Sequence, residues 1–400
     1  MSYDILIRNA RTRTHEGLVC IAIQAGKIAA IESEINEEAK QVIDAAGRLV
    51  TESFVNGHLH LDKVYTLEMA GQTALKEYNA GGMGGAMTSI ERAADFKAAY
   101  DESWILPNVR KACDLAVKYG NTHIRAFADV DSKARLEGVK ALLAAREEYK
   151  DRVTLEVVAF PQDGVDREPG TRELIREAME MGADVVGGIP WIEFTPELEQ
   201  DHVDSMCALA KKFDKPISML LDDVGDAEER TLEMLCKKSI EMKWQGRVTA
   251  QHCRAMQLYP ENYFRKLVTL LKQAGVGIIS DPHTGPLAAR VRDLLAAGVP
   301  VGLGQDDIQD AYYPFGECNM QQIAFLAAHL LNMRTFEDME LLYDMVTTSA
   351  AKALGLKNHE LKVGGDADLV ILEQEDVYHA IWYHTAPAYV IKNGVDITVK

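Results

Sequence analysis

Residues 54–60 read FVNGHLH, a short apolar run that ends in two histidines. It is the first of eight runs rich in Val, Ile or Phe, and longer segments with the period of an amphipathic helix separate them. The eight runs are FVNGHLH (54–60), HIRAFAD (123–129), TLEVVAF (154–160), DVVGGI (184–189), ISMLLD (217–222), VTAQH (248–252), GIISD (277–281) and PVGLGQD (300–306). Eight strand–helix units of this length predict an α/β fold, a closed (β/α)₈ barrel of the TIM type with about 250 residues.

The segments between these runs are long enough for the helices that connect parallel strands. They include 91–119, which Gly120 would end, 197–212, 227–243 and 286–297. The alternative fold is a doubly wound open sheet, but no G-x-G-x-x-G follows the first strand. The pattern therefore favours the closed barrel.

The two ends of the chain have a different pattern. Residues 3–50 and 366–399 alternate apolar and polar positions around turn signals such as Ala25-Gly26-Lys27 and Asn393-Gly394, which is typical of antiparallel strands. Because the termini of a barrel lie at its surface, the two ends can meet in one sheet structure. We expect two domains with these ranges: a small β-sandwich of residues 1–53 and 360–400, and a barrel of residues 54–359.

Charge and composition exclude several classes of partner. The chain has 43 Lys and Arg against 61 Asp and Glu, a net charge of −18, which argues against nucleic acid as a partner. No apolar run approaches the ~18 residues of a membrane span, so we expect no membrane partner. The six cysteines lie far apart with no C-x-x-C pair, which favours a reducing compartment. We therefore expect a cytoplasmic protein.

Reactive side chains collect at the predicted carboxyl ends of the strands, where barrel enzymes place their active sites. His58 and His60 end the first strand, and the period of two puts both imidazoles on one side. His252 ends the sixth strand, and Asp306 with Asp307 ends the eighth. These residue types are suited to hold one metal ion. The alternatives are a buried core histidine at 252 and an Asp306-Asp307 pair that caps a helix over 315–331.

Together these motifs resemble the amidohydrolase superfamily, closest to its cytosine deaminase-like branch, which also includes the enzyme that removes isopropylamine from N-isopropylammelide. The resemblance spans nearly the whole chain and implies a barrel with a small β-sandwich. It rests on FVNGHLHLDK (54–63), VVAFPQDG (157–164), GADVVGGIPWIEF (182–194), VTAQH (248–252), GQDDIQDAYYPFG (304–316) and GGDADLVIL (364–372).

The resemblance also implies roles for single residues. His58, His60 and Asp306 would bind one divalent metal ion, zinc or iron, which activates a water molecule. Asp306 would accept the proton of that water, and His252 would stabilise the developing oxyanion. The fourth strand, DVVGGIP, carries no lysine to bridge a second metal, so the resemblance implies a mononuclear site, and Lys63 is not expected to be a ligand.

Substrate contacts follow from the same resemblance. It implies that Gln162 binds the amide-like edge of a heterocycle, where it offers a donor and an acceptor together. Asp307 and Tyr312 would line the pocket. Trp191 follows the fourth strand, where the relatives differ among themselves, so this position would tune the choice of substrate.

One stretch departs from the family pattern. The relatives end their fifth strand in H-x-x-E, a further metal ligand and a proton shuttle, whereas residues 220–223 here are Leu-Leu-Asp-Asp. Leu220 cannot coordinate a metal, and Asp223 is one methylene shorter than glutamate. Three protein ligands and a water still make a workable catalytic zinc site. Alternatively, His252 or His283 supplies the missing nitrogen, or the fold has lost its metal.

The predicted function is a metal-dependent hydrolase that cleaves a C–N bond, by deamination or dealkylamination, in a small nitrogen heterocycle such as a pyrimidine or triazine. Asp223 would relay protons to the ring and to the leaving amine. One alternative is a cyclic amidohydrolase that opens a ring amide. Another is a metal-poor ligand-binding relative that has lost hydrolysis. The expected partners are a small heterocyclic substrate and further copies of the chain in a homo-oligomer.

Overall fold

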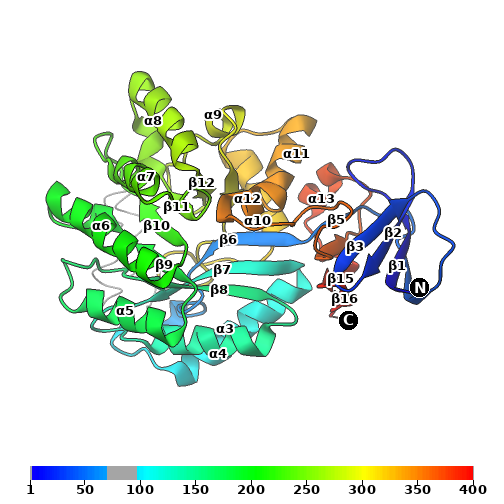
Figure 1. Cartoon of the computed structure of the whole chain (residues 1–400), viewed down its shortest axis with the longest axis horizontal. Helices are drawn as coiled ribbons and strands as arrows, with labels where there is room; N and C mark the ends of the chain where they lie inside the picture. The colour runs from blue at the N-terminus through cyan, green and yellow to red at the C-terminus, as the bar shows by residue number, and fades with distance from the viewer. Residues whose placement is uncertain (1, 70–96, 400) are drawn as a thin grey trace.

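The computed structural model describes residues 2–69 and 97–399, and it contains an eight-stranded parallel sheet surrounded by helices, next to two small sheets (Figure 1). The eight strands are β6 (Phe54–Leu59), β7 (Asn121–Asp129), β8 (Thr154–Phe160), β9 (Val185–Gly188), β10 (Ile217–Leu221), β11 (Val248–His252), β12 (Val276–Ser280) and β13 (Val301–Leu303). They pair in chain order, and all their pairings are parallel. The predicted (β/α)₈ barrel is confirmed, with small differences at the strand ends.

The first and last barrel strands meet at the carboxyl ends of the sheet. The backbone N–H of Asp306 donates to the carbonyl of His58 at 2.9 Å, and the N–H of His60 donates to the carbonyl of Asp306 at 2.8 Å. Gly304 allows this close approach, since a Cβ atom there would lie 2.6 Å from the Cβ of His58. The backbone that closes the barrel therefore also brings these three side chains together.

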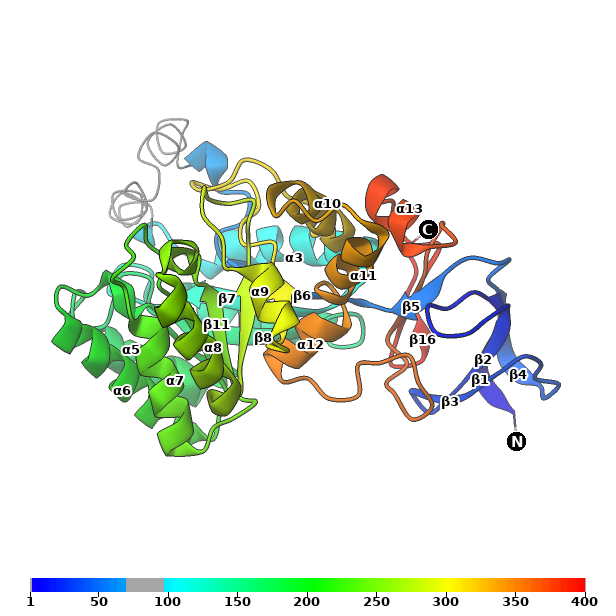
Figure 2. The same ribbon diagram turned by 90° about the horizontal axis from the view of Figure 1, so that it is seen from above.

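Helices follow the strands and cover the outside of the barrel (Figure 2). They are α3 (Glu102–Lys118), α4 (Glu137–Tyr149), α5 (Thr171–Met181), α6 (Pro196–Phe213), α7 (Thr231–Met242), α8 (Glu261–Ala274), α9 (Val291–Ala296), α10 (Met320–Leu330), α11 (Phe336–Asp344) and α12 (Thr348–Leu354). Gly120, with φ +77°, follows α3 as predicted, whereas residues 91–96 lie outside the described part of the chain. The predicted helix over 286–297 is shorter and spans only Val291–Ala296, and before it the Ala288 N–H donates to Gln257 Oε1 at 2.9 Å.

Two small sheets lie beside the barrel, and both chain ends contribute to them (Figure 1). The first has the order β3-β2-β1-β4, and the second has the order β16-β15-β14-β5. Their strands are β1 (Tyr3–Ala10), β2 (Val19–Gln24), β3 (Lys27–Glu32), β4 (Ala39–Asp44), β5 (Val50–Glu52), β14 (Leu369–Ile371), β15 (Tyr389–Lys392) and β16 (Val395–Asp396). One apolar cluster with residues from both sheets joins them. The domain limits at residues 53 and 360 stay a prediction.

Two details of the terminal segments were predicted wrongly. The chain from β3 to β4 crosses over before it pairs with β1, so this pair is parallel rather than antiparallel, with Ile5 opposite Gln41. The segment 366–399 also contains a helix, α13 (Val377–Tyr383), which packs against α10 and α11. The Asp376 side chain starts this helix by accepting a hydrogen bond from the backbone N–H of His379 at 2.8 Å.

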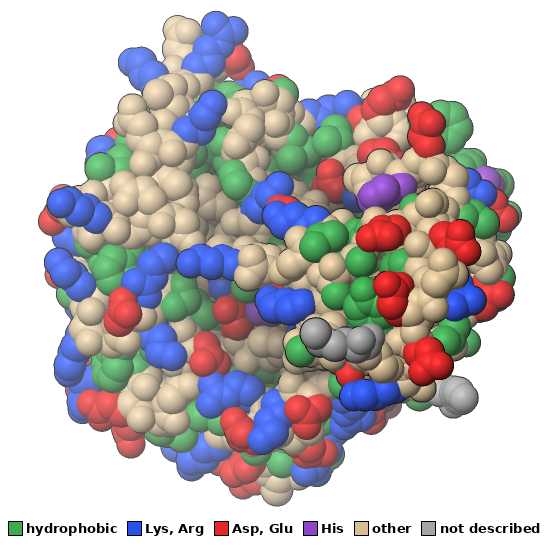
Figure 3. All heavy atoms as spheres, turned by 45° about the vertical axis from the view of Figure 1, so that its right-hand side comes forward, with side chains coloured by type: hydrophobic (Ala, Val, Ile, Leu, Met, Phe, Trp, Pro, Cys, Tyr) green, Lys and Arg blue, Asp and Glu red, His purple; other side chains and the backbone are tan. Residues whose placement is uncertain are grey.

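One face of the molecule carries charged side chains of both signs (Figure 3). Figure 3 shows Lys and Arg side chains interspersed with Asp and Glu side chains on the face that includes the small sheets. Within the described residues, none of the helices combines the length and the apolar character that a membrane crossing requires.

Candidate active site

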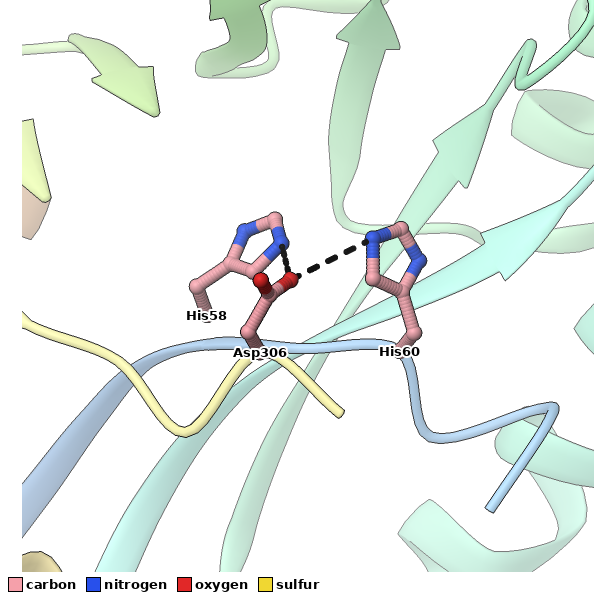
Figure 4. A group of neighbouring side chains, drawn as sticks. All are labelled: His58, His60 and Asp306. Carbon is pink, nitrogen blue, oxygen red and sulfur yellow. Dashed lines mark ion pairs between the residues drawn. The ribbon is translucent and has the colours of Figure 1, made fainter. Parts of the chain in front are cut away.

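Two histidines from the first barrel strand and an aspartate that follows the last one meet at the mouth of the barrel (Figure 4). Asp306 Oδ1 lies 3.1 Å from His58 Nε2 and 3.8 Å from His60 Nε2. All three side chains are buried. The two imidazoles come from the end of β6, His58 within the strand and His60 directly after it. They point toward the carboxylate that follows β13, so the predicted convergence of these residues is present.

The backbone is bent where two of the strands end. Asp306 has φ +64° and His252 has φ +62°, a left-handed conformation that is uncommon for residues other than glycine. Such conformations carry a cost of about 1–3 kcal/mol and cluster at functional sites. Asp306 also does not cap the next helix, as the alternative required, because Asn319 does so by accepting a bond from the Gln322 N–H.

His252 joins the same group of side chains. Its Nε2 lies 3.8 Å from Asp306 Oδ1, and its ring centroid lies 4.8 Å from that of His58. Asp281 Oδ2 lies 3.2 Å from His252 Nδ1, which favours a proton on Nδ1 and leaves Nε2 for the site. In contrast, His283 Nε2 bonds to the carbonyl of Gln305 at 3.0 Å. Of the two histidines left open by the sequence, His252 is thus the one that faces Asp306.

The donor atoms of this group fit a metal ion. Apart from the Asp306 carboxylate 3.1 Å from His58 Nε2, the ring nitrogens of His58 and Nδ1 of His60 are buried without a hydrogen-bond partner among the described residues. Buried polar atoms without partners are costly, so they indicate a missing ligand. Imidazole nitrogen and carboxylate oxygen are the donors that zinc and iron accept in proteins. The cluster of His58, His60 and Asp306 can therefore hold one divalent ion.

Burial and neighbouring charges shift the pKa values of the site residues, in some cases in opposite directions. Burial holds the pKa of His60 well below its ordinary value, and Lys63 acts in the same direction. Burial also favours the neutral form of His252, but the carboxylates of Asp223 and Asp306 outweigh it and raise the pKa of this histidine. The pKa of Asp306 is lowered despite burial, because His252 and His58 face it. The carboxyl group of Asp306 is therefore ionised at neutral pH.

A pocket opens above this cluster, and it contains nearly all of the predicted site residues. Its walls are formed by His60, Gln162, Ile189, Trp191, Leu220, Asp223, His252, Arg254, Asp306, Asp307 and Tyr312. His58 lies beneath the pocket and is fully buried. Leu220 packs into an apolar cluster with Trp191 and Phe160, so an apolar part of the pocket wall stands where a histidine ligand was expected.

Sequence reasoning missed several polar residues around the pocket. Arg254 Nη1 donates to Asp223 Oδ1 at 2.6 Å. Lys63, which was discounted as a ligand, is buried and donates to Gln162 Oε1 at 3.1 Å. Asp281 follows β12, so the rule that barrel sites lie at strand ends could have found it. No local pattern marks Arg254, whereas Lys63 ends the FVNGHLHLDK stretch.

The chain matches the family model described as the Amidohydrolase family over residues 41–396. The chain belongs to the amidohydrolase family. It is 32% identical over 397 residues to the N-isopropylammelide isopropyl amidohydrolase of Pseudomonas sp. (strain ADP), covering 98% of this chain and 96% of the relative. The crystal structure of 5-methylcytosine deaminase from Klebsiella pneumoniae, liganded with 5-fluorocytosine, matches with a TM-score of 0.89 and 32% identity, over 99% of this chain and 97% of that one.

A second solved structure is similar. It is N-isopropylammelide isopropylaminohydrolase from Burkholderia multivorans, with a TM-score of 0.82 and 25% identity over 100% of this chain and 98% of that one. This amidohydrolase is therefore an enzyme that hydrolyses carbon–nitrogen bonds other than peptide bonds. Its family depends on metal ions, and the residues at the barrel mouth can supply the ligands.

Proposed function

We propose that the enzyme removes an exocyclic amine or alkylamine from a small nitrogen heterocycle such as a pyrimidine or triazine. The observation that carries the proposal is the convergence of His58, His60 and Asp306 at the floor of a pocket whose walls include Gln162 and Trp191. The relatives named above act on N-isopropylammelide and 5-methylcytosine, which are rings of this kind. A flat ring suits the space beside the Trp191 side chain.

The metal would be one zinc or iron ion bound by His58, His60 and Asp306, and it would supply Lewis-acid activation of water. Asp306 Oδ1 faces the imidazoles and is placed to accept a proton from the attacking water. His252 would stabilise the negative charge that develops on the attacking oxygen as the ring carbon becomes tetrahedral. Asp223, which also lines the pocket, would carry protons to the ring nitrogen and the leaving amine.

Gln162 and its neighbours would orient the ring. The ammonium of Lys63 can only donate, so its contact at 3.1 Å identifies the Gln162 atom as the oxygen and leaves the NH₂ group for the substrate. Asp307 and Tyr312 would complete the polar side of the pocket. Such a site favours a ring that presents an acceptor to Gln162.

The test is product identification in water enriched in ¹⁸O, with a panel of aminopyrimidines and alkylamino-triazines. We expect release of ammonia or alkylamine, and one labelled oxygen on the intact ring. A ring-opened product would instead identify a cyclic amidohydrolase. Binding of a ring without turnover, in protein that holds no metal, would favour the metal-poor relative that Leu220 suggests.

We also propose that the enzyme works as a homo-oligomer in the reducing cytoplasm. The aromatic side chains of Phe336, Trp382 and Tyr383 on α11 and α13 are 72%, 49% and 52% exposed and are joined through the ring of Tyr378. They form one patch of the kind that marks protein interfaces. All six cysteines are free thiols. Light scattering should give a multiple of 44.3 kDa, and a mass of one chain would contradict the oligomer.

A further inference from the structure

Arg254 is a buried cation in the wall of the pocket. It is the first residue of the short helix η3 (Arg254–Leu258), which follows β11. Only 5% of the residue is exposed. Gly285 makes room for it, because a Cβ atom there would lie 2.9 Å from Arg254 Nε. A buried guanidinium needs ionic or hydrogen-bonding partners to offset its lost hydration.

Two of those partners connect Arg254 to carboxylates of the site. Arg254 Nη1 donates to Asp223 Oδ1 at 2.6 Å. Arg254 Nη2 donates to Thr284 Oγ1 at 2.6 Å, and that hydroxyl lies 2.6 Å from Asp306 Oδ2. Arg254 Nη2 itself lies 3.7 Å from Asp306 Oδ2.

The direction of this chain of hydrogen bonds follows from the chemistry of its members. A guanidinium can only donate and an ionised carboxylate can only accept. The Thr284 hydroxyl must therefore accept from Arg254, and its single proton is directed to Asp306 Oδ2, the nearer acceptor, rather than to the Asp281 carbonyl at 3.1 Å. As a result, Asp306 Oδ2 accepts the hydrogen bond from Thr284, and Asp306 Oδ1 faces the imidazoles.

We infer that Arg254 is a positioning residue for both acidic groups of the reaction, directly for Asp223 and through Thr284 for Asp306. The inference rests on the proposed function, in which these two carboxylates move protons. The three residues Asp223, Arg254 and Thr284 follow three successive strands, β10, β11 and β12, so one cation ties together three loops of the mouth. Leu220 can make no polar contact with these carboxylates. The hydrogen bonds that start from Arg254 therefore hold the two carboxylates in place.

The first test removes the Arg254 side chain by mutation and then adds free guanidinium ion to the variant. In R254A, kcat should fall by about 100-fold, the cost expected for a displaced catalytic group, while KM changes little. Guanidinium ion, at concentrations far below those that unfold proteins, should restore kcat in a saturable way, and methylammonium should not. R254K keeps the positive charge but lacks the planar guanidinium that can donate to Asp223 and Thr284 at once, so its kcat should stay low. R265A, at an exposed arginine, is the control and should not respond to guanidinium.

The second test is a double-mutant cycle with Asp223. If Arg254 acts through that carboxylate, R254A and D223N together should lose little more kcat than the more impaired single variant. T284V should lower kcat by about tenfold and keep the wild-type thermal stability. This result would show that Arg254 acts on Asp306 through the Thr284 hydroxyl. Fully additive losses, or an R254A enzyme with wild-type kcat, would overturn the inference.

A third measurement separates this inference from the proposed function and remains usable if no substrate is found. Isothermal titration calorimetry should detect guanidinium binding to R254A but not to the wild-type enzyme or to R254A/D223N. Such binding supports the assignment of Arg254 even if all heterocycles tested are inert, which would defeat only the proposed function. If R254A does not fold, T284V carries the test, and wild-type kcat in T284V overturns the inference.

Discussion

The two halves of the barrel interior both bury histidine, acidic and basic side chains, but they differ in how those side chains are bonded. Near the amino ends of the strands, Arg125 donates to Glu156 Oε2 through Nε at 3.0 Å and Nη2 at 2.7 Å, and to Thr249 Oγ1 at 2.9 Å. His123 Nε2 lies 3.1 Å from the same carboxylate. At the mouth, by contrast, Nδ1 of His58 and Nδ1 of His60 have no hydrogen-bond partner among the described residues, and the Nε2 atoms of His58, His60 and His252 all lie around one carboxylate oxygen, Asp306 Oδ1.

This difference separates a structural network from a functional one. The charges of Arg125 and Glu156 are matched within the protein, and Arg125 with His123 lowers the pKa of Glu156 despite its burial. The donors at the mouth are arranged around Asp306 Oδ1 and need a further atom to satisfy them. We therefore expect mutations at the mouth to change chemistry, and mutations at the amino ends to change stability.

The largest effect should follow from D306N. The amide keeps the size of the side chain but cannot accept a proton as a carboxylate does, so kcat should fall by at least about 10³-fold. Circular dichroism and thermal melting should show a folded protein. D226N, an exposed aspartate in the loop after β10, is the matched control with wild-type activity. An active D306N enzyme would remove this residue from the mechanism.

R125M should have the opposite profile. It leaves the partly buried Glu156 carboxylate with only His123 beside it, which should lower the free energy of unfolding by about 2–3 kcal/mol. The folded fraction should keep the wild-type kcat and metal content. Urea denaturation measures the stability, and R125M/E156Q should recover part of it because both charges are then gone. A loss of kcat as large as that of D306N would show that the two halves are not separate.

Much of this contrast could be predicted from the sequence. Strand periodicity and the rule that sites lie at strand ends were sufficient to bring His58, His60, His252 and Asp306 together before any coordinates. These rules work because alternation along a strand and closure of a barrel leave few places for a side chain to point.

The rest depends on contacts between loops, which no local pattern encodes. Arg254 and Asp223 are 31 residues apart and meet only because β10 and β11 are neighbours. Arginine is seldom buried, so composition favours an exposed side chain at that position. The helix α13 was missed because its seven residues are too few to show a clear period, although Asp376 is a recognisable N-cap.

A smaller change at the mouth is expected from L220H. The new imidazole would stand beside His252 in the apolar wall, where it could add a ligand. Resistance to metal removal by a chelator should rise by about tenfold, equivalent to about 1.4 kcal/mol. L220M is the control for side-chain size and should leave metal retention unchanged. Faster metal loss from L220H would mean that position 220 does not face the ion.

The smallest effect concerns a mouth-side loop that takes no part in the site. Burial, with Glu199 and Asp222 nearby, raises the pKa of Glu229 from 4.5 to about 7. The folded protein keeps a proton that the unfolded chain releases above pH 4.5, so this group's contribution to stability falls as the pH rises from 4.5 to about 7. E229Q should therefore be more stable than wild type above pH 7, by about 1 kcal/mol, with no change in kcat. Urea denaturation of both proteins at pH 4.5 and above pH 7 measures this difference. The prediction would be contradicted if E229Q and the wild type were equally stable above pH 7.

The central claim is that the imidazoles of β6 and the carboxylate after β13 share a metal ion. Elemental analysis of enzyme purified without chelators tests it most directly, with H58N/H60N as the comparison. We predict about one zinc or iron ion per chain in the wild type and almost none in the variant. A wild-type value near zero, or equal values in both proteins, would contradict the claim.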